Sequence, residues 1–243
     1  MIIDDTIQKH YNSMLLARNA EKEATHEPSG KLSASMLYQP LRFQVLKSIG
    51  APRKPMEAYT LGKFDRGDEV EAKVALVTKD FGALVEQQKF VEYREAIGYV
   101  DMVVNTDLMP YKMGLMPWEI KSVTNAKLKR INVTGVDYHY QMQACFYALA
   151  MGLKHYAVVI ASGEDNRMTT YVYPVESMQR EVDHAIGEYM KAMEEWRHNQ
   201  VLPKFAPNPK VPWTSNIQYA MFTEEWVSDD KWAITQLETL GII

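Results

Sequence analysis

Residues 116–123 read MPWEIKSV and place two charged side chains inside an apolar run. Because charged groups are costly to bury, Glu119 and Lys121 need a structural or chemical reason to be there. The run is short and rich in apolar and aromatic residues, which predicts a strand. Residues two apart on a strand share a face, so Glu119 and Lys121 are expected to project together, with Ile120 on the opposite side.

A carboxylate interrupts the preceding apolar stretch, GYVDMVV at residues 98–104, in the same way. Residues 89–104 also have the composition of strands, and NTDLMPYKMG at residues 105–114 predicts the turn that follows them. If these strands pair as a hairpin, Asp101 stands beside Glu119. Two neighbouring carboxylates repel each other unless a cation lies between them, and hard oxygen ligands favour Mg²⁺ or Mn²⁺.

A lysine beside such a cation would give the cluster a chemical role. Lys121 would orient or help to deprotonate an attacking water, or stabilise charge on a phosphate. Asp101, Glu119 and Lys121 are therefore candidate catalytic residues for metal-assisted phosphodiester hydrolysis. The alternative is a solvated surface pair, since Glu-x-Lys is a common string and recurs at residues 71–73. That copy lies in a helical pattern, where residues two apart do not face each other.

The order of predicted elements is helices, three strands, a helix, two strands and a helix, which indicates an α/β fold with a small mixed sheet flanked by helices. Pro40 is expected to kink or restart one of the helices, with Ser33 or Ser35 as its N-cap and Gly50 as its end. The predicted helices cover residues 5–27, 33–50, 67–82, 135–152, 176–200 and, after an extended arm, a short stretch near 228–241. The predicted final strands cover residues 155–162 and 167–175, around the turn GEDN.

Composition indicates a single globular domain over residues 1–243, with N-terminal helices to about residue 60 and a Pro-rich C-terminal arm from about residue 201. No apolar run approaches the length of a membrane span, and the N-terminus lacks a signal-peptide pattern, so a cytoplasmic location in a bacterium or phage-infected host is expected. The single cysteine, Cys145, allows no internal disulfide and no cysteine-ligated cluster. The net charge of −4 means that any contact with DNA must be local.

Asp101 followed by Glu119-Ile120-Lys121 resembles the motif of the PD-(D/E)XK nuclease superfamily. The following helix carries Gln143 and Tyr147 at the spacing of the Gln-x-x-x-Tyr motif, so the chain is similar to the RecB-like branch. The resemblance implies a restriction-endonuclease-like core, an Mg²⁺ or Mn²⁺ cofactor and supporting catalytic roles for Gln143 and Tyr147. It also implies that the Ile120 carbonyl is a metal ligand and that no iron–sulfur cluster is bound.

The same resemblance suggests an additional metal ligand upstream. Gly67 and Glu71 match a Gly-x-x-x-Glu pattern that RecB-like chains carry on a helix before the strands, so Glu71 is a candidate ligand, directly or through water. Glu69 is the alternative, and a solvated helix charge is the simpler interpretation of either residue.

Candidate DNA contacts are basic or hydroxylic. Lys127, Lys129 and Arg130 lie in NAKLKR directly after the predicted Glu-x-Lys strand, and phosphate contacts require such cations. Ser122 and Thr124 would donate to phosphate, and Arg42 is expected, by analogy, to contact the end of a DNA strand. An ordinary basic loop is the alternative for the NAKLKR segment.

Three further polar or aromatic residues are weaker candidates for a functional role. Trp213 and Tyr219 on the C-terminal arm would either stack on unpaired bases or, as we prefer, pack against the core or a second subunit. His139 is expected to be structural.

The chain is therefore expected to be a metal-dependent deoxyribonuclease, most simply an exonuclease acting at DNA ends in recombination, repair or replication. The alternatives are a structure-specific or sequence-specific endonuclease on the same core, and a non-catalytic DNA-binding module that keeps the fold. DNA is the expected partner, with a single-strand-binding or annealing protein and other copies of the chain as further candidates, and no membrane contact is expected.

Overall fold

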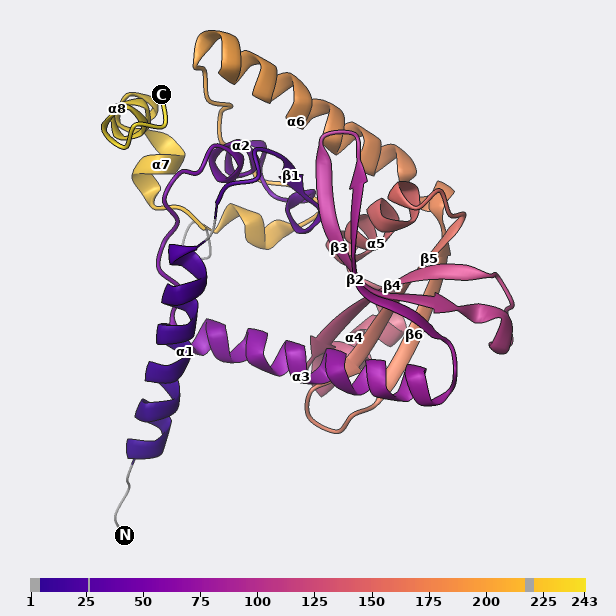
Figure 1. The fold of residues 1–243 in the computed structure, drawn as a ribbon. Helices are drawn as coiled ribbons and strands as arrows, with labels where there is room; N and C mark the ends of the chain where they lie inside the picture. Colours follow the sequence, from indigo (N-terminus) through magenta and orange to yellow (C-terminus); the bar gives the residue numbers. More distant parts are fainter. Residues whose placement is uncertain (1–4, 26, 217–220) are drawn as a thin grey trace.

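A mixed sheet forms the centre of the computed structural model, which describes residues 5–25, 27–216 and 221–243 (Figure 1). Within these residues six strands pair in the order β1-β3-β4-β5-β6, and β2 pairs with β3 beside this path. Strands β1 and β3, and β4 and β5, run parallel, whereas the other pairs are antiparallel. The strands are β1 (Leu32–Ser33), β2 (Leu84–Tyr93), β3 (Ala96–Asn105), β4 (Leu115–Val123), β5 (His155–Ser162) and β6 (Met168–Pro174).

Helices cover both faces of the sheet, which confirms the predicted α/β class (Figure 1). Helix α3 packs on one face, and α4, α5 and α6 pack on the other. The helices are α1 (Thr6–Ala24), α2 (Leu41–Ser48), α3 (Ala58–Asp80), α4 (Asn125–Thr134), α5 (Tyr138–Ala150), α6 (Gln179–Asn199), α7 (Glu224–Ser228) and α8 (Asp230–Thr239).

Strand β5 shows why the sheet is buried between two helical layers. Val158 and Ile160 point into the apolar cluster that contains α5 and α6, whereas Ala157 and Val159 point into the cluster under α3. All four residues are at most 2% exposed. Each large side chain buried in this way contributes roughly 1.5–3 kcal/mol relative to its exposed state, so the central strands anchor the fold.

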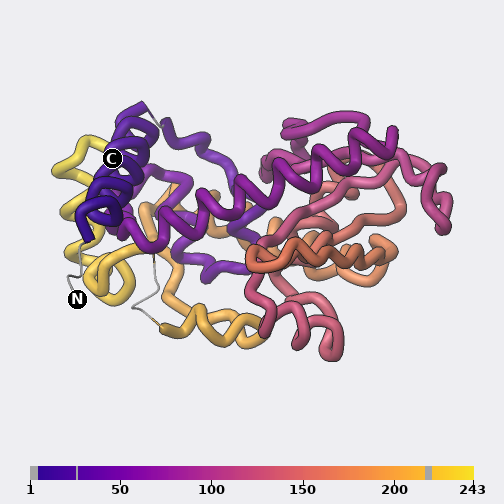
Figure 2. Tube along the Cα trace, turned by 90° about the horizontal axis from the view of Figure 1, so that it is seen from below, coloured from indigo at the N-terminus to yellow at the C-terminus, as the bar shows by residue number. Residues whose placement is uncertain are grey.

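The molecule is elongated, and both ends of the chain lie at the same end of it (Figure 2). Helix α1 packs on the first half of α3, where Leu15 lies against Gly62. Helices α7 and α8 lie at that end too, on the side of the sheet away from the β3–β4 turn (Figures 1 and 2). None of the helices in the described ranges combines the length and the hydropathy that a bilayer crossing requires.

The structure corrects the helix predicted over residues 33–50. Residues 32–33 form the short strand β1, a 3-10 turn follows over Ala34–Met36, and the helix begins only at Leu41. Pro40, rather than Ser33 or Ser35, is the N-cap of α2, because its ring favours a helix start and blocks continuation from the preceding turn. Gly50 has a φ of +84° and follows the end of the helix, as predicted.

The segment after β4 is a helix and not the loop that its basic composition suggested. Helix α4 begins after Thr124, whose hydroxyl oxygen accepts a hydrogen bond from the backbone amide of Lys127 at 3.3 Å. Leu128 and Ile131 bury the inner side of α4. The predicted short helix near the C-terminus is present as α8, with Asp229 as its cap.

Candidate active site

Glu119 and Lys121 project from the same face of β4, as the period of the strand predicts. Trp118 and Ile120 join the apolar cluster under α3, so the two charged residues between and after them point toward the α5 layer. Glu119 is fully buried, and the side chain of Lys121 is 26% exposed. The Lys121 ammonium forms an ion pair with Glu119 Oε1.

Asp101 reaches this pair from the neighbouring strand. Strands β3 and β4 pair as an antiparallel hairpin, and the pair Met102–Trp118 is the last in their ladder, which places Asp101 next in register to Glu119. Beyond that pair, Asp101 Oδ2 accepts a hydrogen bond from the backbone amide of Ile120 at 2.7 Å. The predicted convergence of Asp101, Glu119 and Lys121 is therefore present in the structure.

The three charges strongly perturb one another. Burial, and then the charge of Glu119, raises the pKa of Asp101 well above its usual range. Burial also raises the pKa of Glu119, although the Lys121 ammonium opposes this shift. Burial alone would lower the pKa of Lys121, but the Glu119 and Asp101 carboxylates outweigh it and the pKa is raised. Two buried carboxyl groups thus share one ammonium, so ionising both of them creates an excess of negative charge.

That excess fits a divalent cation. Neither carboxylate oxygen of Glu119 has a hydrogen-bond partner among the described residues, and the ion pair with Lys121 touches only one of them. A buried carboxylate with an unused oxygen is costly unless a further cation or donor completes it. No cluster of three or more acidic, histidine or cysteine side chains suited to a metal occurs in the described ranges. The residues that could hold a cation are therefore the two carboxylates, and such hard oxygen donors suit Mg²⁺ or Mn²⁺ better than zinc.

Helix α5 closes the site with Gln143 and Tyr147. The Gln143 amide donates a hydrogen bond to the Tyr147 hydroxyl at 2.9 Å, so one turn of helix brings both predicted residues together. Tyr147 is buried, and burial followed by the charge of Glu119 raises the pKa of its hydroxyl. Its ring lies so close to Gly98 of β3 that a Cβ there would come within 2.8 Å of it. Gly98 is thus required for α5 to approach the strand that carries Asp101.

Glu71 lies at the edge of the site, and Gln88 holds it there. The Gln88 amide donates a hydrogen bond to Glu71 Oε1 at 2.7 Å. The charge of Glu71 contributes to the raised pKa of both Asp101 and Glu119, which places it within their electrostatic range. The alternative residue, Glu69, lies instead in a cavity beside α1.

Gln88 is a residue of the site that sequence reasoning missed. The pairs Gln87–Met102 and Lys89–Val100 flank it, so Gln88 lies opposite Asp101 in the β2–β3 ladder. Its φ of +50° is left-handed, a conformation that glutamine rarely adopts within a strand. Strained backbone of this kind tends to occur at functional sites. Gln88 sits in a polar, exposed run that carries no sequence signal for it.

The three basic residues of α4 that were predicted to contact DNA have different surroundings in the structure. Lys127 and Arg130, three residues apart on α4, both form ion pairs with Asp137, at 3.0 and 2.6 Å. Lys127 also donates to the Tyr140 hydroxyl at 2.9 Å. Lys129 is exposed on another side of the helix. These cations lie after β4, but two of the three already share the carboxylate of Asp137.

The structure contradicts the predicted DNA contact of Arg42, because this residue is buried. Its side chain is 1% exposed and donates to the carbonyl oxygens of Trp226 and Pro203 and to the carboxylate of Asp230. The guanidinium is used to fasten the C-terminal segment to α2, because its planar fork satisfies several acceptors at once.

Ser122 lies on the face of β4 opposite Lys121. Its hydroxyl would be 3.0 Å from a Cβ at Gly163, a position that also adjoins Arg66 of α3. The structure therefore does not bring Ser122 together with Lys121.

His139 and Trp213 meet beside the site in an aromatic cluster. Their ring centroids are 5.9 Å apart, and Tyr38 lies within 5.5 Å of both. Burial lowers the pKa of His139 to about 4, so the ring is neutral at neutral pH and packs as an aromatic, as expected of a structural histidine. Trp213 contacts the rings of Tyr38 and His139 and is 41% exposed. Tyr219 falls outside the described residues.

Comparison with known proteins gives a likeness in fold. The alkaline exonuclease LHK-Exo from Laribacter hongkongensis, solved in complex with dAMP, matches with a TM-score of 0.52 and 14% sequence identity, over 70% of this chain and 93% of that chain. The crystal structure of SSO0001 matches with a TM-score of 0.51 and 14% identity, over 88% of this chain and 93% of that one. No protein-family model matches the sequence. A search of curated proteins also finds no match.

Proposed function

We propose that the protein is a metal-dependent deoxyribonuclease that acts at DNA ends. The observation that carries the proposal is the convergence of Asp101, Glu119 and Lys121, from two adjacent strands, on a buried site. Within the part of the chain that the structure describes, the Glu119 carboxylate has no hydrogen-bond partner. The likeness in fold to an alkaline exonuclease supports the same conclusion at the level of architecture. We place the chain in the RecB-like branch on its Gln143 and Tyr147.

Asp101 and Glu119 would hold Mg²⁺ or Mn²⁺, with the Ile120 carbonyl and water completing the shell. The bound ion would polarise the scissile phosphate and lower the pKa of a coordinated water. The two carboxylates keep Lys121 oriented through the ion pair with Glu119, so its ammonium would position the water nucleophile and stabilise charge that develops on the phosphate.

The surrounding residues would prepare this site before substrate arrives. The Gln143–Tyr147 hydrogen bond fixes both side chains on the face of α5 that covers Glu119. The amide of Ile120 holds the Asp101 carboxylate beside β4. Gln88 holds the Glu71 carboxylate near both acids, where it would act as an outer ligand through water.

One assay tests the proposal. End-labelled linear duplex, single-stranded DNA and closed circular DNA are incubated with Mg²⁺ or Mn²⁺, using the wild-type protein, Lys121→Ala and Lys73→Ala. Lys73 belongs to the second Glu-x-Lys string and donates to Asn166 on the surface, so it is the matched control. We expect release of nucleotides from linear DNA only, lost in Lys121→Ala and kept in Lys73→Ala.

The other outcomes separate the remaining functions. Cleavage of closed circles would assign an endonuclease to the same residues. Binding without cleavage, under every metal condition, would assign a non-catalytic DNA-binding module. Hydrolysis that persists unchanged in Lys121→Ala would show that the chemistry takes place elsewhere.

A further inference from the structure

A cavity of about 620 Å³ lies between α4, the start of α5 and the segment after α6. Its walls combine cations with aromatic rings: Lys127, Arg130, Lys210, Tyr138, Tyr140 and Trp213. The volume is in the range of small-molecule sites. Neither the ligand set of the candidate active site nor the packing of the core accounts for this combination.

The cavity lies next to the candidate active site, and the ring of Tyr140 stands between them. The Lys121 ammonium lies 5.5 Å from the centre of the Tyr140 ring, and Lys127 lies 4.8 Å from the same ring. Lys127 also donates to the Tyr140 hydroxyl. Tyr140 therefore borders both sites, because Lys121 lies near its ring and Lys127 contacts its hydroxyl.

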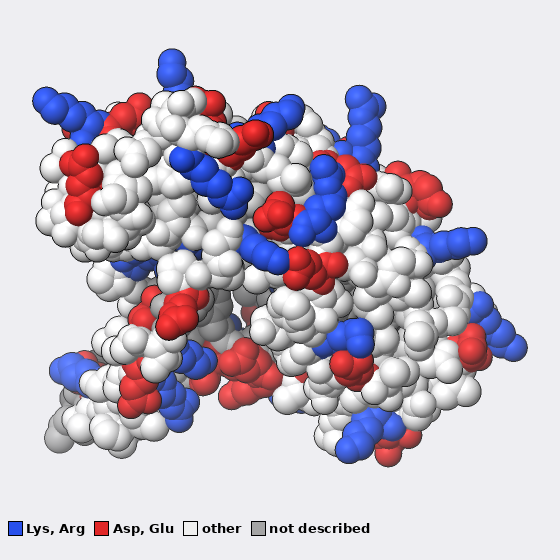
Figure 3. All heavy atoms as spheres, turned by 45° about the horizontal axis from the view of Figure 1, so that its top comes forward, with Lys and Arg blue, Asp and Glu red and all other residues white. Residues whose placement is uncertain are grey.

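Positive charge exceeds negative charge in the lining. Three lining residues are Lys or Arg and one, Asp137, is acidic. Lys210 pairs with Glu181 at 3.4 Å and lies 4.7 Å from the centre of the Tyr138 ring. Burial lowers the pKa of His139; the charge of Asp137 opposes this shift, and Lys127, Lys121 and Arg130 add to it. Elsewhere on the surface the signs are mixed, since Lys and Arg are interspersed with Asp and Glu over the face in Figure 3.

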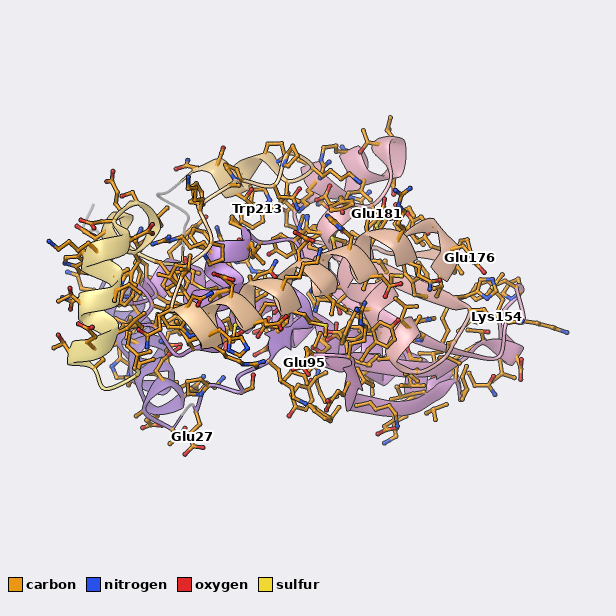
Figure 4. All side chains as sticks on the ribbon, turned by 90° about the horizontal axis from the view of Figure 1, so that it is seen from above. Glu27, Glu95, Lys154, Glu176, Glu181 and Trp213 are labelled. Carbon is orange, nitrogen blue, oxygen red and sulfur yellow. The ribbon has the colours of Figure 1, made fainter. Side chains whose placement is uncertain are left out.

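Trp213 gives this cavity a surface for stacking. It lies on the segment after α6, on the same side of the molecule as Glu181 and away from Lys154 (Figure 4). Contacts at steep angles with Tyr38 and His139 fix the indole, and 41% of it stays exposed. An oriented, partly exposed indole beside lysine and arginine is the combination that proteins use to bind single-stranded nucleic acid.

We infer that this cavity binds a nucleotide of an unpaired DNA strand next to the scissile phosphate, with its base on Trp213 and its phosphate near Lys127 and Arg130. The inference rests on the proposed nuclease function and specifies how the substrate lies. It assigns the enzyme a preference for ends with an unpaired strand, because bases inside a duplex stack on one another and leave no face free for a protein side chain.

The test measures binding without hydrolysis. Wild-type protein in chelator is titrated with a short oligothymidylate and with an abasic strand of the same length, and tryptophan fluorescence and anisotropy are recorded. Trp118, Trp196 and Trp226 are buried and Trp232 is half-buried, so quenching that is lost in Trp213→Ala identifies Trp213 as its source. We expect quenching by oligothymidylate alone, and a dissociation constant about tenfold weaker in Trp213→Ala and for the abasic strand.

Three variants sharpen the result. Trp213→Phe should keep most of the affinity but lose the quenching, because a phenyl ring still stacks. Tyr59→Ala removes an aromatic that is 73% exposed but does not line the cavity, and should bind like wild type. Arg130→Gln should reduce the slope of log Kd against log salt by about 0.7, the value for one phosphate contact to a single strand.

Equal affinity of wild type and Trp213→Ala for both strands would overturn the inference. So would a concentration-dependent dimer that Trp213→Ala converts to monomer, since a second copy would then cover the indole. Hydrolysis by the wild type together with either result would leave the proposed function standing. The expected binding pattern without hydrolysis under any metal condition would reject the nuclease and keep the binding site.

Discussion

The carboxylate of Asp101 accepts a hydrogen bond from the backbone amide of Ile120 at the point where β3 and β4 stop pairing. A side chain thus takes the place of a strand carbonyl, which satisfies an amide that would otherwise be buried without a partner. The same carboxylate lies beside Glu119. Asp101 therefore serves both the sheet and the proposed cation site.

Two substitutions separate these roles. Asp101→Asn keeps an oxygen that accepts from Ile120 but removes the charge, so its free energy of unfolding should stay near that of wild type while hydrolysis falls at least tenfold. Asp101→Ala should lose the same activity and, in addition, about 1–3 kcal/mol of stability, because the amide is left unsatisfied. Urea unfolding in chelator and the nuclease assay measure the two effects. Equal stability of both variants would show that the hydrogen bond contributes nothing.

Metal binding should stabilise the folded protein. Adding Mn²⁺ at about 100 times its dissociation constant is expected to contribute about 2.7 kcal/mol, because only the folded chain brings Asp101 and Glu119 together. For a chain of this size that corresponds to a rise in Tm of about 2–4 °C per kcal/mol. Glu119→Gln should abolish the rise, and Glu176→Gln, at an exposed position, should keep it. A rise that is unchanged in Glu119→Gln would place the ion elsewhere.

The left-handed backbone at Gln88 allows its side chain to be tested apart from its conformation. Gln88→Gly and Gln88→Ala both remove the hydrogen bond to Glu71, so both should raise the Mn²⁺ concentration for half-maximal activity about tenfold. Gln88→Gly should be about 1 kcal/mol more stable than Gln88→Ala, because glycine adopts a positive φ without the strain that alanine shares with the native glutamine. Gln87→Ala, at the neighbouring exposed position, should change neither quantity. Normal metal dependence in Gln88→Gly would show that Glu71 needs no support.

The central hairpin and its site follow from short-range rules. Period-two alternation in MPWEIKSV predicts that Glu119 and Lys121 share a face, and the structure has Trp118 and Ile120 on the other. The interruption at Asp101 predicts a hairpin partner for Glu119, which the register provides. The four-residue spacing of Gln143 and Tyr147 predicts their contact on α5. In each case the determining distance lies within one element or between two adjacent ones.

What the sequence does not predict depends on distant contacts. In the sequence, Arg42 looks like any cation on a helix. Its partners Trp226 and Asp230 belong to α7 and α8, near the other end of the chain. The helix α4 was missed because its basic composition suggested a loop, whereas Leu128 and Ile131 are buried only once the sheet exists. Gln88 becomes part of the site because β2 pairs with β3 at Asp101 and α3 lies nearby.

Arg42 should behave as a structural residue. Arg42→Ala is expected to cost about 3 kcal/mol, the lower end for removing one partner of a buried ion pair, because Asp230 is itself exposed. Hydrogen exchange should increase mainly in residues 221–243, which the guanidinium fastens to α2. The salt dependence of DNA binding should not change. A reduced salt slope with normal exchange would restore the DNA-contact interpretation.

Asp137 sets the charge of the cavity and should give it a measurable pH dependence. Burial would raise the pKa of Asp137, but Arg130 and Lys127 outweigh it and the pKa is lowered. Because the folded pKa is below the unfolded value of about 3.9, the carboxylate stabilises the fold above that pH and loses its contribution as the pH falls through the folded pKa. Asp137→Asn should therefore be less stable than wild type near pH 7, and the difference should vanish in strong acid.

The same variant frees both cations, so oligothymidylate should bind more tightly and with a steeper salt slope. Weaker binding by Asp137→Asn would show instead that the carboxylate is needed to hold Lys127 and Arg130 in the orientation that receives a phosphate.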